Sequence, residues 1–253
     1  MSTKILSVIF SFEKIKKENM KKQLLVLIVA IVAFGCKKDD ELPTGSIIGF
    51  VNLYSKSGSA LDDFSGANVS IDNTKIVTTT DSDGKFELKN VPPGTYDISI
   101  TKPGFGDYKQ FSIPYAGPPA PGGIPAINTY TGTSPTIVIG EIPLFTLTDF
   151  SFDNLDGRLL IQGTASTANG VVIIYLSKGS KASNKDYDSF LLATVENGSF
   201  TYDITGVFPS GSNLKIIAYP TNSYSTIYID RNTNKRIYTS LGKASSVINV
   251  TIL

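Results

Sequence analysis

The sequence has no histidine, no tryptophan and a single cysteine. Without histidine, the chain lacks the most common metal ligand and the most common general base at neutral pH. One cysteine cannot form a disulfide within the chain, and it excludes a metal site built from several thiolates. These absences favour a protein that binds or supports over one that catalyses, and we expect no cofactor.

Charge is scarce and nearly balanced, with 23 Lys plus Arg against 22 Asp plus Glu. Six lysines and two acids lie in residues 1–35, so the remainder carries a net charge of about −3. The sequence contains no basic stripe and no glycine-rich phosphate loop. We therefore do not expect nucleic acid as a partner.

The longest hydrophobic run extends from Leu24 to Phe34 and follows two lysines. As a helix it would be about 16 Å long, roughly half the thickness of a hydrocarbon core, so it is too short to span a bilayer. It has the form of a secretory signal peptide, which we place at residues 1–35. Residues 1–19 are an unusual prefix for such a signal, so we expect translation to start at Met20; the alternative is a long functional region before the run.

The only cysteine lies directly after this run, in the segment "AFGC", Ala33–Cys36. The segment resembles a bacterial lipobox, although Phe34 is bulkier than the usual Ala or Ser. The resemblance implies that Cys36 is acylated, with palmitate among its chains, and begins a tether of residues 36–44. Each buried methylene contributes about 0.8 kcal/mol to such an anchor. The alternative is a buried free cysteine.

Charged residues follow the cysteine as "KKDDE", Lys37–Glu41. They resemble the lysine-and-acid export signal of surface lipoproteins in one group of Gram-negative bacteria. The resemblance implies a lipid-anchored protein of the outer membrane that faces the cell exterior. The alternative is a solvated spacer on a protein that faces the periplasm.

Residues 45–147 alternate short apolar segments with Gly, Pro, Asn and Asp. In "GTYDISITK", Tyr96, Ile98 and Ile100 fall on one side of a period of two, which is typical of a half-buried strand. "DSDG", Asp81–Gly84, has the composition of a tight turn. Its acids also raise the alternative of a calcium loop, but the spacing of an EF-hand would place Thr79 and Asn90 at ligand positions.

The stretch Ala67–Phe105 resembles the carboxypeptidase regulatory-like domain, above all in the order "DSDGKFEL", "VPPGTY" and a final Ile. The resemblance implies a seven-stranded β-sandwich of transthyretin type over residues 45–147 and a non-catalytic accessory role. A Pro/Gly-rich insert, residues 114–133, departs from the family pattern. Tyr115 and Tyr130 at its ends are candidate stacking platforms for a sugar, if the insert does not simply cover an edge strand.

Residues 148–253 repeat the strand pattern without a recognised family, and predict seven to nine strands of an immunoglobulin-like β-sandwich. Asn197-Gly198 is typical of a type I′ hairpin turn, and Asp230–Lys235 indicates a second hairpin. Tyr219, Tyr224 and Tyr228 form a candidate recognition face, although alternating tyrosines also serve packing. The predicted fold class is all-β, with two β-sandwich domains in tandem.

Three aspartates, Asp149, Asp153 and Asp156, are the best candidates for a carboxylate pair of the kind that cleaves glycosides. Asp156-Gly157 reads more simply as a turn. Lys243 beside Ser245 and Ser246 is a weaker candidate for a nucleophile and its base.

The sequence therefore predicts a non-catalytic envelope lipoprotein that acts as a structural or binding module. The alternatives are an accessory glycan- or nutrient-binding lipoprotein of an uptake system and, last, a lipid-anchored hydrolase. The expected partners are the membrane, through the anchor, and either a glycan or another envelope protein.

Overall fold

The computed structural model describes residues 43–118, 136–222 and 227–252. The predicted signal peptide, Cys36 and nearly all of the tether lie outside the described residues, as does most of the insert. The described residues form sixteen strands and no helix, which confirms the all-β class. Accordingly, no helix long and apolar enough to cross a membrane occurs in these ranges.

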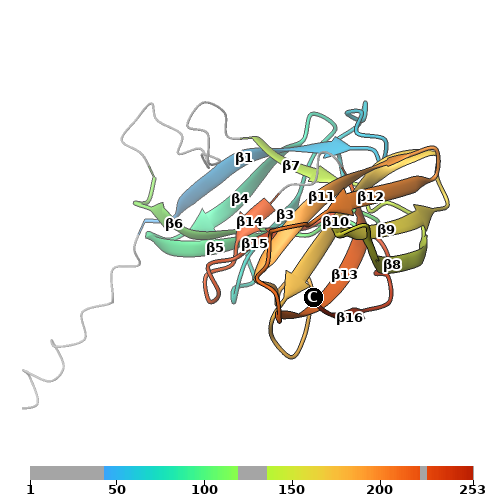
Figure 1. Cartoon of the computed structure of the whole chain (residues 1–253). Coiled ribbons are helices and arrows are strands. Elements are labelled where there is room, and N and C mark those ends of the chain that lie inside the picture. The colour runs from blue at the N-terminus through green and yellow to red at the C-terminus, as the bar shows by residue number, and fades with distance from the viewer. Residues whose placement is uncertain (1–42, 119–135, 223–226, 253) are drawn as a thin grey trace, which may run out of the picture. The chain divides into compact units, whose positions relative to one another are not determined.

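The first module consists of seven strands in two sheets (Figure 1). One sheet has the order β4 (Lys85–Val91), β1 (Gly45–Tyr54), β7 (Thr136–Gly140). The other has the order β3 (Val77–Thr79), β2 (Asn68–Ile71), β5 (Gly94–Thr101), β6 (Tyr108–Tyr115). Side chains from both sheets, such as Val51, Leu88 and Ile100, fill one core. The two layers match the seven-stranded sandwich that the sequence predicts.

Alternation of apolar and polar residues places the first module's core. In β5, Ile98 and Ile100 are buried while Asp97, Ser99 and Thr101 are only partly covered. Successive side chains of a strand point to opposite faces, so the isoleucines face the other sheet. The predicted period of two is confirmed in this strand.

Local turn chemistry joins the strands as predicted. Asp81 accepts hydrogen bonds from the backbone N–H groups of Asp83 and Lys85, which makes "DSDG" a turn. Gly84 has a φ of 77°, and a Cβ there would lie 2.2 Å from the Val51 carbonyl oxygen, so only glycine fits. Asn197 and Gly198 both have positive φ, as a type I′ turn requires.

The second module contains nine strands, within the predicted number. Seven of them form one antiparallel sheet in the order β16 (Ile248–Thr251), β13 (Asn213–Thr221), β10 (Asn169–Ser177), β11 (Ser189–Glu196), β12 (Ser199–Asp203), β9 (Arg158–Ala165), β8 (Leu147–Leu155). The remaining two, β14 (Ile227–Ile229) and β15 (Arg236–Tyr238), form the hairpin predicted around Asp230–Lys235.

The large sheet wraps around a single core to which all seven of its strands contribute. Its edge strand β8 contacts β13 and β16 at the opposite edge. All seven strands are hydrogen-bonded into one sheet, and its two ends lie in contact. The sheet therefore folds back on itself around the core.

Strand β10 is buried on both faces, which explains its unbroken apolar run. Val172 and Ile174 face the main core of the second module, whereas Ile173 and Tyr175 face a smaller cluster on the other side of the sheet. Tyr175 packs there against the rings of Tyr187 and Tyr219. Burial and these neighbouring tyrosines raise the pKa of Tyr175 far above its usual value, so its phenol stays neutral.

Candidate functional site

Buried hydrogen bonds join the two modules. Asn222, which is 2% exposed, donates from Nδ2 to the carbonyl oxygens of Ser55 (2.8 Å) and Glu141 (3.2 Å). Ser240 is fully buried and donates from Oγ to the Gly140 carbonyl at 2.9 Å. A buried polar group without a hydrogen-bond partner destabilises the fold. Separating the modules would break these bonds, so the bonds fix how the modules meet.

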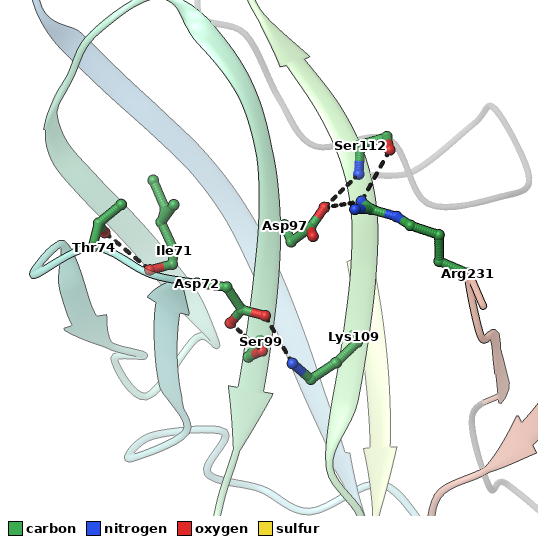
Figure 2. Close-up of polar contacts among 8 residues, drawn as sticks. All are labelled: Ile71, Asp72, Thr74, Asp97, Ser99, Lys109, Ser112 and Arg231. Carbon is green, nitrogen blue, oxygen red and sulfur yellow. Dashed lines mark hydrogen bonds and ion pairs between the residues drawn. The ribbon is translucent and has the colours of Figure 1, made fainter. Parts of the chain in front are cut away.

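The β14–β15 hairpin of the second module packs on strand β6 of the first. Tyr228 lies against the first module's core, with ring centroids 6.4 Å from Tyr108 and 6.0 Å from Phe111. Arg231 donates to Asp97 and Ser112 (Figure 2). Its guanidinium also lies 5.0 Å from the centre of the Phe111 ring. The hairpin is thus attached to the first module by aromatic and charged contacts.

The strands that receive the hairpin are themselves braced by a polar cluster. Asp72 accepts hydrogen bonds from Ser99 Oγ (2.6 Å) and Lys109 Nζ (2.7 Å), which link β2, β5 and β6 (Figure 2). Burial alone would raise the pKa of Asp72, but these hydrogen bonds outweigh burial and lower it. The carboxylate therefore stays ionised and holds the sheet beneath the hairpin.

A pocket of about 540 Å³ lies where the two modules meet, and we call it the junction pocket. Its first wall is the turn between β5 and β6 in the first module. Its second wall is the hairpin and the loop between β10 and β11. The side chains that matter to its chemistry are Lys102, Phe105 and Asp107 from the first module and Asn184, Lys185, Tyr228 and Tyr238 from the second.

Gly106 is what allows the two walls to approach. A Cβ at this position would lie 2.5 Å from the Thr239 carbonyl carbon and 2.6 Å from its oxygen. Real Cβ atoms do not come this close to backbone atoms, which cannot rotate away as a flexible side chain can. The shape of the pocket therefore depends on glycine at this position.

Three polar side chains in the junction pocket are uncommitted. The carboxylate of Asp107, the side-chain amide of Asn184 and the ammonium group of Lys185 form no hydrogen bond or ion pair with other residues of the described ranges. Lys102, in contrast, donates to the Ser65 carbonyl. The three free groups offer acceptors and donors for a ligand.

The two tyrosines of the pocket are neutral at physiological pH. Burial, assisted by Asp230 and Asp107, raises the pKa of Tyr228. Burial likewise raises the pKa of Tyr238, which packs on Phe190 with centroids 5.2 Å apart. Their hydroxyls are therefore suited to hydrogen bonding, and neither acts as a phenolate base.

The structure describes three of the five predicted tyrosines, and it places them in different surroundings. Tyr228 lines the junction pocket, whereas Tyr219 packs on Tyr175. Tyr115 was expected to be exposed, but its side chain is 3% exposed because it ends β6 within the first module's core. Tyr130 and Tyr224 lie outside the described residues, as does Cys36.

Each of the three candidate catalytic aspartates either accepts hydrogen bonds from neighbouring side chains or forms a turn. Asp149 accepts a hydrogen bond from Thr164 Oγ1, and Asp153 accepts from Ser151 Oγ and Gln162 Nε2. Asp156 has a φ of 51° and forms the β8–β9 turn with Gly157, as predicted. Within the described ranges, no cluster of three or more acidic or cysteine side chains is arranged to hold a metal ion.

A second pocket, of about 590 Å³, lies beside the linker between the modules. It is lined by Pro143, Leu144 and Phe145 and by the β9–β10 turn. Leu144 is 77% exposed, and Lys56 is the single charged residue of the lining. Its lining contains no tyrosine and no acidic side chain, so the junction pocket is the stronger candidate site.

Sequence reasoning missed most of the junction pocket. Asp107, Asn184, Lys185 and Tyr238 were not predicted as site residues, since they lie in turns and strand ends with no motif around them. The one local signal is "GFGD", Gly104–Asp107, where two glycines flank a buried Phe. A glycine that no turn requires indicates a close approach of another backbone.

Comparison with known families identifies the first module. The family model of the carboxypeptidase regulatory-like domain matches residues 49–119. These residues form a carboxypeptidase regulatory-like domain. The junction pocket thus lies at the end of this domain that carries the β5–β6 turn, and the second module builds the other wall. No relative was found among curated protein sequences.

Several solved structures are distantly similar. A type II cohesin–X-dockerin complex from Acetivibrio cellulolyticus is 23% identical over 38% of this chain and 58% of that one, with a TM-score of 0.30. A proposed carbohydrate binding protein and a DUF3823 family protein, both from Bacteroides uniformis, are 9% and 12% identical, and each match covers 83% of this chain and 100% of the other. Their TM-scores are 0.30 and 0.33, too low to assign the pocket a ligand.

Proposed function

We propose that the protein is a non-catalytic binding module of the cell envelope, anchored in the outer membrane by acyl chains on Cys36 and facing the cell exterior. The short apolar run, the "AFGC" segment and the "KKDDE" segment support the anchor and its orientation. In this role the carboxypeptidase regulatory-like domain and the second module act together as one body that presents a ligand site.

The observation that supports binding most directly is the junction pocket. Residues of both modules line it, and three of its polar side chains have no partner among the described residues. Pockets with aromatic walls and a few convergent polar groups are the usual sites of ligand binding. Binding is favoured over hydrolysis because the aspartates best suited to acid–base chemistry hold turns and strands instead.

The anchor is tested with Cys36→Ala in the full-length chain. We expect the wild-type protein to incorporate a clickable palmitate analogue, to sediment with outer membranes and to begin at an acylated Cys36 by mass spectrometry. The variant should lose the label and appear in the soluble fraction. Labelling of the variant, or an unmodified wild-type chain that begins upstream of Cys36, would contradict the anchor.

Orientation is tested by replacing Lys37–Glu41 with five serines. Protease added to intact cells should degrade the wild-type protein and spare the variant, because the variant keeps its acyl chains but stays on the periplasmic side. Both proteins should be degraded once the cells are lysed, which controls for folding. Equal protection of both proteins in intact cells would contradict the exterior location.

A further inference from the structure

We infer that the junction pocket binds a neutral oligosaccharide, with Tyr228, Tyr238 and Phe105 offering apolar surface to the sugar rings and Asp107, Asn184 and Lys185 bonding to hydroxyl groups. This inference rests on the proposed binding function and names the ligand class of the same site. The sequence leaves a glycan and another envelope protein as alternative partners, and the pocket favours the glycan.

The aromatic residues suit the apolar faces of sugar rings. Tyr228 and Tyr238 lie on opposite faces of the same hairpin, because Tyr228 pairs with Ile237 and Tyr238 with Ile227. Both residues line the pocket, and Phe105 contributes an apolar surface from the opposite wall. Their rings are already held by neighbours, Tyr228 by Tyr108 and Tyr238 by Phe190, so they lose little conformational freedom on binding. An amphipathic ring with one polar end fits a ligand whose faces carry C–H groups and whose edges carry hydroxyls.

The free polar groups suit sugar hydroxyls. A hydroxyl group both donates and accepts hydrogen bonds. It can donate to the Asp107 carboxylate, accept from the Lys185 ammonium group, or do either with the side-chain amide of Asn184, which has both a donor and an acceptor. Asp107 and Lys185 are exposed and Asn184 is partly exposed, so water solvates them in the free protein. A sugar hydroxyl can replace that water, whereas an apolar peptide side chain would cover these groups and offer them no partner. The combination therefore favours a polyhydroxylated ligand over a protein segment.

The charges in and around the pocket indicate a neutral ligand. Asp107 faces the pocket together with Lys102 and Lys185, and Lys102 is committed to the Ser65 carbonyl. Lys185 also lies close enough to Asp230 to help lower its pKa, after the stronger effect of the hydrogen bond from the Thr233 N–H. These opposite charges largely cancel, so no strong field attracts an anionic polymer.

The modules hold the site in shape before a ligand arrives. Gly106 lets the first wall contact the Thr239 backbone, and Asn222 and Ser240 fix the modules elsewhere along the same junction. A preformed site avoids the entropy loss of ordering loops during binding. The preformed pocket therefore favours the affinity for a ligand such as a glycan, whose individual hydrogen bonds contribute little.

The inference is tested with the acylated full-length protein in detergent on an array of neutral glucan, xylan, mannan and galactan oligosaccharides. Polygalacturonate and heparin fragments serve as anionic probes. We expect binding to at least one neutral oligosaccharide and recovery of that oligosaccharide at its original length. Asp107→Ala and Asn184→Ala should each weaken binding by about tenfold, the effect of one lost hydrogen bond to a charged or well-placed group.

Matched controls are Asp149→Ala and Asn249→Ala, which replace the same residue types at exposed positions far along the chain. They should bind as the wild type does. Binding to none of the neutral oligosaccharides, binding to the anionic probes alone, or binding that survives the pocket substitutions would overturn the inference. Shortening of the oligosaccharide would overturn the non-catalytic function itself, so the two failures are distinguishable.

A second measurement works inside cells and does not depend on the array. A photo-crosslinking amino acid replaces Pro103, an exposed residue of the pocket lining with no assigned ligand contact, and the cells are irradiated during growth on a mixture of plant and microbial polysaccharides. Carbohydrate adducts at position 103 support the inference. Adducts with protein alone, or no adduct in a chain that still reaches the surface, count against a glycan ligand while the anchored binding function stands.

Discussion

At the scale of single residues, Gly106 sets how closely the two modules approach. The Cβ of an alanine would lie 2.5 Å from the Thr239 carbonyl carbon, so the backbones must separate. We expect Gly106→Ala to lower the free energy of unfolding by about 1–3 kcal/mol, the usual effect of overpacking. Urea denaturation measures this, with Gly179→Ala in an exposed loop as the control. An unchanged midpoint in Gly106→Ala would show that the walls separate freely.

Asp203 is the acidic residue whose pKa the fold lowers most clearly. Hydrogen bonds from the Thr205 hydroxyl and N–H, followed by one from Arg158, lower its pKa from 3.8 to about 2. A carboxyl group with a lowered pKa stabilises the fold when ionised. Its contribution is complete above about pH 4 and is lost as the pH falls through about 2.

We therefore expect Asp203→Asn to weaken the acid dependence of stability between about pH 4 and pH 2. Thermal unfolding followed across this range measures the effect. Asp149→Asn is the control, because no Arg or Lys pairs with that carboxylate among the described residues. If wild type and Asp203→Asn lose stability in parallel over the whole range, the hydrogen bonds from Thr205 and Arg158 do not hold in solution.

At the scale of elements, the β14–β15 hairpin joins the second module to the core of the first. Tyr228 packs on Tyr108 and Phe111, so Tyr228→Ala removes an aromatic ring from that contact. We expect a loss of about 2 kcal/mol, below the 3–5 kcal/mol typical of a fully buried aromatic residue. Hydrogen exchange should accelerate in β5 and β6.

The control for this substitution is Ile229→Ala on the same strand. Ile229 is 44% exposed and is no part of the first module's core, so exchange in β5 and β6 should not change. If both variants accelerate exchange equally, the hairpin acts through its own stability and the Tyr228 contact is unimportant.

Elements defined by local chemistry were predictable from the sequence. The Asp81–Gly84 turn and the Asn197-Gly198 hairpin depend on side-chain acceptors and positive φ within a few residues. The alternation in β5 depends only on a period of two. Such features require no knowledge of distant contacts.

Features that depend on distant contacts were not predictable in the same way. The pairing of β9 with β12 joins segments far apart in the chain, and no local pattern encodes it. Tyr115 looks like a loop residue in the sequence, yet the opposite sheet buries it. Of the junction pocket, only Tyr228 was anticipated, because its other walls come together only when the modules dock.

At the scale of the whole molecule, the described residues form one compact unit with several cores. The buried bonds of Asn222 and Ser240 connect the cores across the junction. Asn222→Ala removes the side-chain amide that donates hydrogen bonds to the carbonyl oxygens of Ser55 and Glu141. The expected loss is about 1–3 kcal/mol, together with weaker coupling between the modules.

The most direct test of this account is differential scanning calorimetry of the full-length protein beside Asn222→Ala. The junction pocket can exist only while the modules hold each other in place. We predict one transition for the wild type, with equal calorimetric and van't Hoff enthalpies, and a broadened or divided transition for Asn222→Ala. Two separate wild-type transitions, neither of them moved by the substitution, would contradict the fixed junction and the site built on it.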